Sequence, residues 1–353
     1  MTANALDSIR DIIQEDIGNR GLHSDPSANL ISATEEDFRL ACQSIASTAD
    51  ARVAIVTGFY IPHAEPPCGE TDGPLGALFL ARALTALGIQ VVLATDSFCQ
   101  KALEVGLGAA GLRKLVPLVI LPSAEKAGPM SLTDYWNAFA DRAGSLTHLI
   151  ALERVGPSHT PESLQAQHGI SIADVQEFLA SVPPEHQDRC HTMRGRDITA
   201  TMSPAHRLFE VAVRKEHGIV TIGIGDGGNE IGMGKIPWSV IRRNIPNGAM
   251  VGCRIPTDHL IVCGVSNWGA YGLAAGVRML RGTPAQIDLF DPDREKELLE
   301  IMVERGPLVD GVTGLPTATV DGLSIDEYLK PLKLLESHLT AKPASRGPSP
   351  PPN

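Results

Sequence analysis

The sequence predicts an α/β protein with a mostly parallel, doubly wound sheet, helices on both faces, additional N-terminal helices and one insertion. Short apolar runs alternate with longer segments of helical periodicity throughout the chain. Strands that are apolar on both faces are typical of a parallel sheet buried between two helical layers. The 34 glycines fit the many tight turns that such a chain requires.

Each predicted strand is an apolar run that ends at glycine or at polar residues. These runs are 52–57, 90–95, 118–121, 148–152, 219–224 and 260–263. The predicted helices lie between and after them. They cover 74–87, the segment after Ser97, 132–142, 172–181, 205–217, 266–282, 291–306 and 325–338. Pro74 in the first turn and Gly88 beyond the last turn are typical boundaries for the first of these helices.

The chain is expected to form one domain over residues 1–340. Helices are predicted within 1–50, and the core is assigned to 51–340. Residues 153–200 are mostly irregular and form the insertion. The tail 341–353 is rich in proline and is predicted to be disordered.

Composition restricts the possible functions. The net charge of −11 argues against nucleic-acid binding, which needs a positive surface. The six cysteines are scattered and form no C-x-x-C pair, which favours a reducing compartment. No run of about 18 apolar residues predicts a membrane span. No signal-like segment opens the chain, so a cytoplasmic protein is expected. The sequence leaves open whether the protein is a homo-oligomer.

The segment 223–234 carries six glycines and follows a predicted strand. Its G-x-G-x-x-G pattern permits a dinucleotide site, but such a site needs a helix at once and an acid about 20 residues on. Pro237 interrupts any such helix, and no Walker A frame is present. Asp226, Asn229 and Glu230 are functional groups in a loop of minimal bulk. They favour a site for an ammonium group or a metal over a glycine turn without function.

Other polar residues follow further strands or precede helices. Ligands bind beyond the carboxyl ends of parallel strands, so these loops are expected to converge on one site. The residues are Glu70, Thr71 and Asp72, Glu153 and Arg154, Arg194, and Asn267 with Trp268. Simpler interpretations stay open: Thr71 or Asp72 as a helix cap, and Glu153–Arg154 as a surface ion pair.

Nucleophilic and zinc-dependent hydrolase motifs are missing from the sequence. There is no H-E-x-x-H pattern, no G-x-S-x-G turn and no local signature around any cysteine. Catalysis by acids and bases is therefore favoured over a Ser or Cys nucleophile.

The motifs together resemble the D-glutamate cyclase family, in particular the C-terminal catalytic-type domain of the eukaryotic enzyme. The resemblance spans about residues 30–335. It is carried by the segments 70–76, 151–156, 193–195, 197–199, 223–234, 259–272 and 310–313. It implies a lyase that converts D-glutamate to 5-oxo-D-proline and water.

Residue roles follow from this chemistry, in which an amine loses a proton and a carboxyl oxygen departs. The predicted catalytic residues are Asp226, Glu230, Glu70 and Asp72. The predicted substrate-binding residues are Gly225, Gly227, Gly228, Asn229, Thr71, Glu153, Arg154, Arg194, Asn267 and Trp268.

In this assignment Arg154 or Arg194 binds the α-carboxylate, and backbone N–H groups of the glycine loop bind the side-chain carboxyl group. No cofactor is certain, but a divalent cation, Mg²⁺ or Mn²⁺, is a candidate at Asp226 and Glu230. Two alternatives stay open. One is another lyase or hydrolase of acidic amino acids or lactams, and the other is a nucleotide-binding regulatory module.

Overall fold

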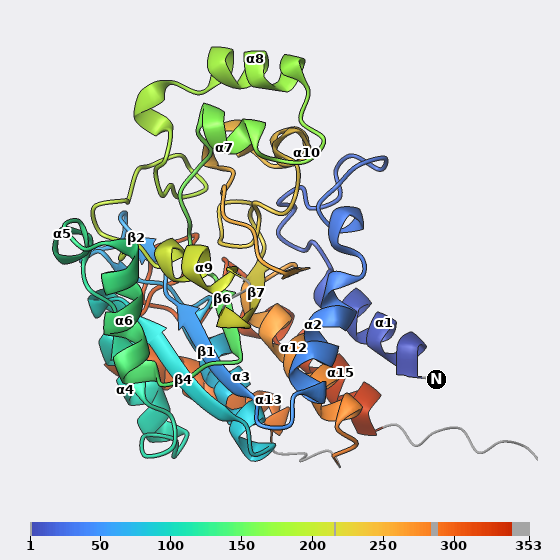
Figure 1. Ribbon diagram of the computed structural model, residues 1–353. Coiled ribbons are helices and arrows are strands. Elements are labelled where there is room, and N and C mark those ends of the chain that lie inside the picture. Colours follow the sequence, from blue (N-terminus) through green and yellow to red (C-terminus); the bar gives the residue numbers. More distant parts are fainter. Residues whose placement is uncertain (1, 215–216, 284–288, 341–353) are drawn as a thin grey trace, which may run out of the picture.

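A six-stranded parallel sheet forms the centre of the computed structural model, which describes residues 2–214, 217–283 and 289–340 (Figure 1). The strand order is β5-β4-β1-β6-β7-β8, and every neighbouring pair is parallel. The strands are β1 (Arg52–Thr57), β4 (Gln90–Thr95), β5 (Leu118–Ile120), β6 (His148–Leu152), β7 (Val220–Gly225) and β8 (His259–Val262). The predicted fold class is confirmed.

Helices cover both faces of the sheet because successive strand residues point to opposite sides. In β1, Val53 and Ile55 belong to one hydrophobic core, whereas Ala54 and Val56 belong to the other. The helices that contribute to the first core include α1 (Thr2–Ile13), α2 (Asp37–Ser47), α3 (Pro74–Ala86), α4 (Ser97–Ala109), α12 (Ser266–Leu280), α13 (Pro292–Arg305) and α15 (Lys330–Thr340). The second core receives α5 (Ala124–Ala127), α6 (Leu132–Ala143), α9 (His206–Ala212) and α10 (Trp238–Asn244).

Smaller elements lie outside these layers. The insertion contains α7 (Pro161–Gln165) and α8 (Ile172–Ser181), which lie at the top of Figure 1. A hairpin of β2 (Tyr60–Ile61) and β3 (Cys68–Gly69) follows β1. The remaining short helices are α11 (Gly248–Val251), α14 (Ile325–Tyr328) and two 3₁₀ turns at Ser32–Thr34 and Pro184–His186.

Helix boundaries differ from prediction by more than two residues at two places. The helix expected over 205–217 ends at Ala212, and the one expected over 325–338 is divided into α14 and α15. Pro331 explains the division, because it has no N–H to donate to the preceding turn and suits the first turn of a new helix. Pro237, which was expected to interrupt a helix, directly precedes α10.

The strand order reverses between β1 and β6. From β1 the chain continues to β4 and β5 on one side, whereas β6, β7 and β8 extend the sheet on the other. At such a reversal the loops after the strands diverge and leave a crevice at the carboxyl ends. The polar loops singled out in the sequence follow β1, β6, β7 and β8, and thus start at this edge.

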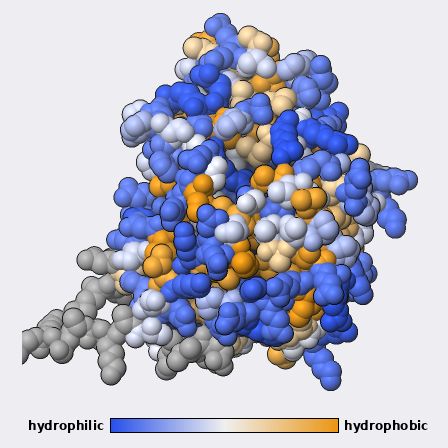
Figure 2. Space-filling view, turned by 180° about the vertical axis from the view of Figure 1, so that it is seen from behind, coloured by the Kyte–Doolittle hydropathy of each residue, from blue (hydrophilic) through white to orange (hydrophobic). Residues whose placement is uncertain are grey.

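Hydrophilic and hydrophobic residues are interspersed on the face shown in Figure 2. None of the described helices is both long and apolar enough to cross a membrane. The tail 341–353, predicted to be disordered, lies outside the described residues.

Candidate active site

A small cavity lies at the carboxyl end of the sheet. It encloses about 120 Å³, well below the roughly 300–1,000 Å³ of pockets that take drug-sized ligands. Its acidic residues and the arginine that faces them are Glu70, Glu153, Asp226, Glu230, Asp321 and Arg20. The volume and the charged walls suit a small polar metabolite.

The carboxyl groups around this cavity are unusually close to one another. Oxygen atoms of Glu153, Asp226 and Glu230 all lie within 4.8 Å of each other, and the same holds for Asp72, Asp226 and Asp321. Asp226 belongs to both groups. Because ionised carboxylates at this separation repel each other, such a cluster retains protons that isolated carboxylates lose.

Asp226 is the central member of the cluster. It follows β7, and only 1% of its surface is exposed. Its Oδ1 lies 3.1 Å from Nη1 of Arg20, whereas its buried Oδ2 has no hydrogen-bond partner among the described residues. Burial raises the pKa of Asp226 well above its usual value, and the charge of Arg20 opposes this rise. Asp226 therefore offers a buried, basic oxygen to a ligand.

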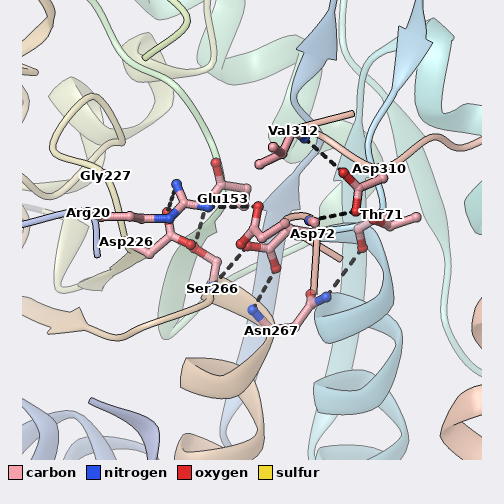
Figure 3. A network of polar contacts seen from close by, with 12 residues as sticks. Arg20, Thr71, Asp72, Glu153, Asp226, Gly227, Ser266, Asn267, Asp310 and Val312 are labelled. Atoms are coloured by element: carbon pink, nitrogen blue, oxygen red, sulfur yellow. Dashed lines mark hydrogen bonds and ion pairs between the residues drawn. The ribbon is translucent and has the colours of Figure 1, made fainter. Parts of the chain in front are cut away.

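Glu153 follows β6 with a positive φ of 44°, which turns its side chain away from the strand direction and toward the cavity. Its Oε2 accepts a hydrogen bond of 2.5 Å from the Ser266 hydroxyl at the start of α12 (Figure 3). Burial raises the pKa of Glu153 well above its usual value, and the nearby carboxyl of Glu230 adds to the rise. The carboxyl group of Glu153 therefore holds its proton more strongly than an exposed glutamate does.

Glu70 and Asp72 lie before α3. Glu70 lines the cavity against Gly311, where an added Cβ would lie 1.8 Å from Oε2 of Glu70. Burial raises its pKa, and Asp321 adds to the effect. Asp72 accepts hydrogen bonds from the backbone N–H groups of Ser266 and Asn267, at 2.9 and 2.8 Å, and does not line the cavity. Burial raises the pKa of Asp72 to about 7.

The glycine loop uses its backbone donors internally. The carboxylate of Glu230 accepts hydrogen bonds from the N–H groups of Asp226, Gly227 and Gly228, at 2.9, 2.6 and 2.7 Å. An added Cβ at Gly225 would lie 2.9 Å from Cδ of Glu230. The donors that were assigned to a substrate carboxyl group are thus occupied by Glu230. They are equally unavailable to the phosphates of a dinucleotide.

Arg154 was predicted to bind a substrate carboxylate, but the structure places it away from the cavity. Its side chain is fully buried and forms an ion pair with Asp96, which follows β4. It also donates to the carbonyl oxygens of Gly58 and Ser203, at 3.0 and 2.7 Å. Arg154 therefore ties together the loops after three strands.

Three further residues from the predicted set lie beneath the cavity rather than in its wall. Asn267 accepts hydrogen bonds from the N–H groups of Gly73 and Gly76 and thereby caps α3. Thr71 donates its hydroxyl to the Thr319 carbonyl oxygen. Trp268 is buried and donates its indole N–H to the Tyr328 carbonyl oxygen. The contacts of all three hold structural elements together.

Arg194 and Asn229 lie at the cavity. Arg194 is exposed and donates to the Val312 carbonyl oxygen at 2.8 Å, which ties the insertion to the segment after α13. Asn229 is buried and donates its amide to the His191 carbonyl oxygen at 2.8 Å. Both join the insertion to neighbouring loops.

Sequence reasoning missed Arg20 and Asp321. Arg20 lies between α1 and α2, and its Nη2 is 2.7 Å from Oδ1 of Asp321. No motif surrounds either residue, and the resemblance was traced only from about residue 30. Arg20 is one of three arginines in the first 50 residues, and local pattern does not separate it from a surface charge.

Comparisons with known proteins identify the family of the chain. A family model described as D-glutamate cyclase-like, C-terminal, matches residues 9–182 and 181–336. Human mitochondrial D-glutamate cyclase is 29% identical over 356 residues, which cover 91% of this chain and 50% of the human protein. The chain thus spans about half the length of that relative. The family match includes the segment of Arg20 as well as that of Asp321. The chain therefore belongs to the D-glutamate cyclase-like, C-terminal family.

Proposed function

We propose that the protein is a lyase that cyclises D-glutamate to 5-oxo-D-proline with release of water. The observation that carries this proposal is a small cavity in which Arg20 contacts one of several buried carboxyl groups, that of Asp226. Membership of the D-glutamate cyclase-like family supports the same reaction.

The proposed reaction moves protons within one molecule. The α-nitrogen attacks the side-chain carboxyl carbon, so a C–N bond forms and a C–O bond breaks. Two protons leave the ammonium nitrogen, and both end on the departing oxygen as water. The protein must therefore accept protons at one place and return them a few ångströms away, and each such step contributes about 10²–10⁴-fold. A cluster of carboxyl groups within 4.8 Å of each other suits this transfer.

In this proposal Asp226 is the base. Its Oδ2 is buried without a partner among the described residues, and burial raises its pKa, which makes it a stronger base than an exposed carboxylate. Glu153 is the acid that protonates the departing oxygen, because it lines the same cavity, and burial and the nearby carboxyl of Glu230 favour its protonated form, whereas the charge of Arg20 favours the ionised form of Asp226. Glu70 is the second candidate acid on the facing wall.

Two residues first assigned to catalysis take supporting roles in this proposal. Glu230 shapes the loop that presents Asp226, since both of its oxygens accept backbone N–H groups. Asp72 lies behind the cavity wall and holds the start of α12, which carries the Ser266 partner of Glu153.

A divalent cation would find oxygen ligands at Asp72, Asp226 and Asp321, as well as at the predicted pair Asp226 and Glu230. The unpartnered Oδ2 atoms of Asp226 and Asp321 fit such an ion. When bound, Mg²⁺ or Mn²⁺ would act as a Lewis acid on the side-chain carboxyl group. Arg20 opposes the binding of a divalent cation, because its positively charged guanidinium already forms ion pairs with two of these carboxylates. We therefore favour the substrate ammonium at Oδ2 of Asp226.

The test is incubation of the purified protein with D-glutamate and, in parallel, L-glutamate, with 5-oxoproline followed by chiral chromatography. We expect 5-oxo-D-proline from D-glutamate. Absence of product from the folded wild-type protein, with and without added Mn²⁺, would overturn the proposal. The role of a cation is tested separately. Protein shown to be metal-free by elemental analysis is assayed before and after Mn²⁺ is added, and an unchanged turnover rate would refute a role for the metal.

A further inference from the structure

The turn at residues 16–22 holds Arg20 in one place. The carboxylate of Asp16 accepts hydrogen bonds from the backbone N–H groups of Arg20, Gly21 and Leu22, at 2.8, 3.0 and 3.0 Å. Leu22 is fully buried in the second core. One carboxylate thus organises three successive N–H donors, and a buried side chain anchors the end of the turn.

The same turn packs tightly against the end of α10. Gly21 has a φ of +97°, and an added Cβ there would lie 2.1 Å from the Asn244 carbonyl oxygen, so no other residue fits. Asn244 also accepts a hydrogen bond of 2.7 Å from the N–H of Asp25 and donates one of 2.8 Å to the Ala28 carbonyl oxygen. The N-terminal segment is therefore fixed to the body of the protein directly after Arg20.

The Arg20 guanidinium lies in the cavity between two carboxylates. It forms ion pairs with Asp226 at 3.1 Å and Asp321 at 2.7 Å, and its side chain is 21% exposed. A guanidinium has five N–H donors, and these two pairs do not use all of them. Arg20 can therefore hold Asp226 and a ligand at the same time.

Charge decides which part of a ligand can lie beside Arg20. The other ionisable side chains that line the cavity are acidic, apart from those of His63 and Arg194, which are both exposed. An anionic group of a ligand is thus most stable at Arg20. In an α-amino acid the carboxylate and the ammonium are attached to the same carbon, so a site for both needs a cation next to an anion. The pair of Arg20 and Asp226 provides that arrangement (Figure 3).

We propose that Arg20 binds the α-carboxylate of the substrate while Asp226 binds the adjacent α-ammonium, so that this pair recognises the α-amino acid end. The inference rests on the proposed function and names how its site selects the substrate. The side-chain carboxyl group then lies toward Glu153 and Glu70, where its oxygen departs. Asp16 is a positioning residue that acts through Arg20.

Two analogues separate the two ends of glutamate. D-2-Aminobutyrate keeps the α-amino acid end and lacks the side-chain carboxyl group, whereas 4-aminobutyrate lacks the α-carboxylate. Their binding to wild-type protein and to the Arg20→Met variant is measured by calorimetry. Arg243→Met is the matched control, because Arg243 also contacts the N-terminal segment, through Asp25 at 3.5 Å, and does not line the cavity.

We expect Arg20→Met to weaken the affinity for D-2-aminobutyrate about 100-fold, as for the loss of two charge-assisted hydrogen bonds. The affinity for 4-aminobutyrate should change less than threefold. Arg243→Met should change neither. If Arg20→Met does not fold, Arg20→Lys serves instead, with about a tenfold loss, because an ammonium cannot make the bidentate contact.

The proposal is overturned if Arg20→Met weakens the affinities for both analogues equally, or weakens the affinity for 4-aminobutyrate alone. It is also overturned if wild-type protein does not bind D-2-aminobutyrate. Binding is measured without turnover, so this result is independent of whether 5-oxoproline forms. If the wild-type protein forms no 5-oxoproline but Arg20→Met loses D-2-aminobutyrate binding, the proposed reaction is refuted and the proposed recognition site is retained.

Discussion

The N-terminal turn at residues 16–22 and the glycine loop at 225–234 are built in the same way and place opposite charges in the cavity. In each, one carboxylate accepts three backbone N–H groups: Asp16 in the turn and Glu230 in the loop. The turn presents Arg20, and the loop presents Asp226. The two side chains meet at 3.1 Å in the cavity.

The two regions differ in burial and in how visible they are in the sequence. Glu230 is 1% exposed inside a loop of five glycines, whereas Asp16 is only partly buried in a segment without a motif. An acid in a loop with an evident motif can therefore bind backbone N–H groups only, while a residue of a turn without a motif can complete the site. Four experiments test this division of roles.

The largest effect is expected for Asp226→Asn. Loss of the proposed base should lower the rate of 5-oxoproline formation by about 10²–10⁴-fold. The fold should persist, because the substitution removes a buried acidic group whose ionised form is unfavourable there. Rates are compared with thermal unfolding of the same sample. Full activity in a folded variant would show that the loop does not supply the base.

Glu230→Gln should act on stability first. The amide has one accepting oxygen and presents N–H donors to at least one of the three backbone N–H groups. We expect a loss of about 3 kcal/mol in the free energy of unfolding, as for a buried donor left without its charged partner. Denaturant titration measures this loss. A Glu230→Gln variant that is as stable as wild type but inactive would indicate a catalytic role for Glu230.

Asp16→Asn is the matched substitution in the N-terminal turn. It should lower the free energy of unfolding by less than Glu230→Gln does. Because the turn is partly exposed, water can replace a lost acceptor, and about 1 kcal/mol is expected. The same titration is used. An equal or larger loss than for Glu230→Gln would contradict the difference in burial between the two regions.

The smallest effect is a shift in the pH dependence of the rate. The charge of Arg20 lowers the pKa of Asp226, so Arg20→Met should raise it. Activity that needs ionised Asp226 increases as pH rises through this pKa. The acidic limb of the pH–rate profile should therefore move to higher pH in the variant. Arg194→Met is the control for which no such movement is expected, and a shift to lower pH in Arg20→Met would refute the assignment.

Arg154 shows why part of the site was beyond sequence reasoning. It follows β6 directly, the position expected for a ligand-binding arginine, and neighbours Glu153, which does line the cavity. The backbone at Glu153 has a positive φ, so the two side chains diverge. Arg154 then forms an ion pair with Asp96 from another loop, and the two residues are 58 positions apart in the sequence.

The sequence by itself determined the parallel α/β fold, the family and the loops that reach the carboxyl edge of the sheet. These depend on local apolar patterning, on glycine positions and on motifs that are contiguous in the chain. Only the tertiary structure decided which polar groups are satisfied by backbone and which face the cavity. Hydrogen bonds and ion pairs depend on distances of about 3 Å between distant segments, so Arg20, Asp321 and Asp226 became one site only when the chain was folded.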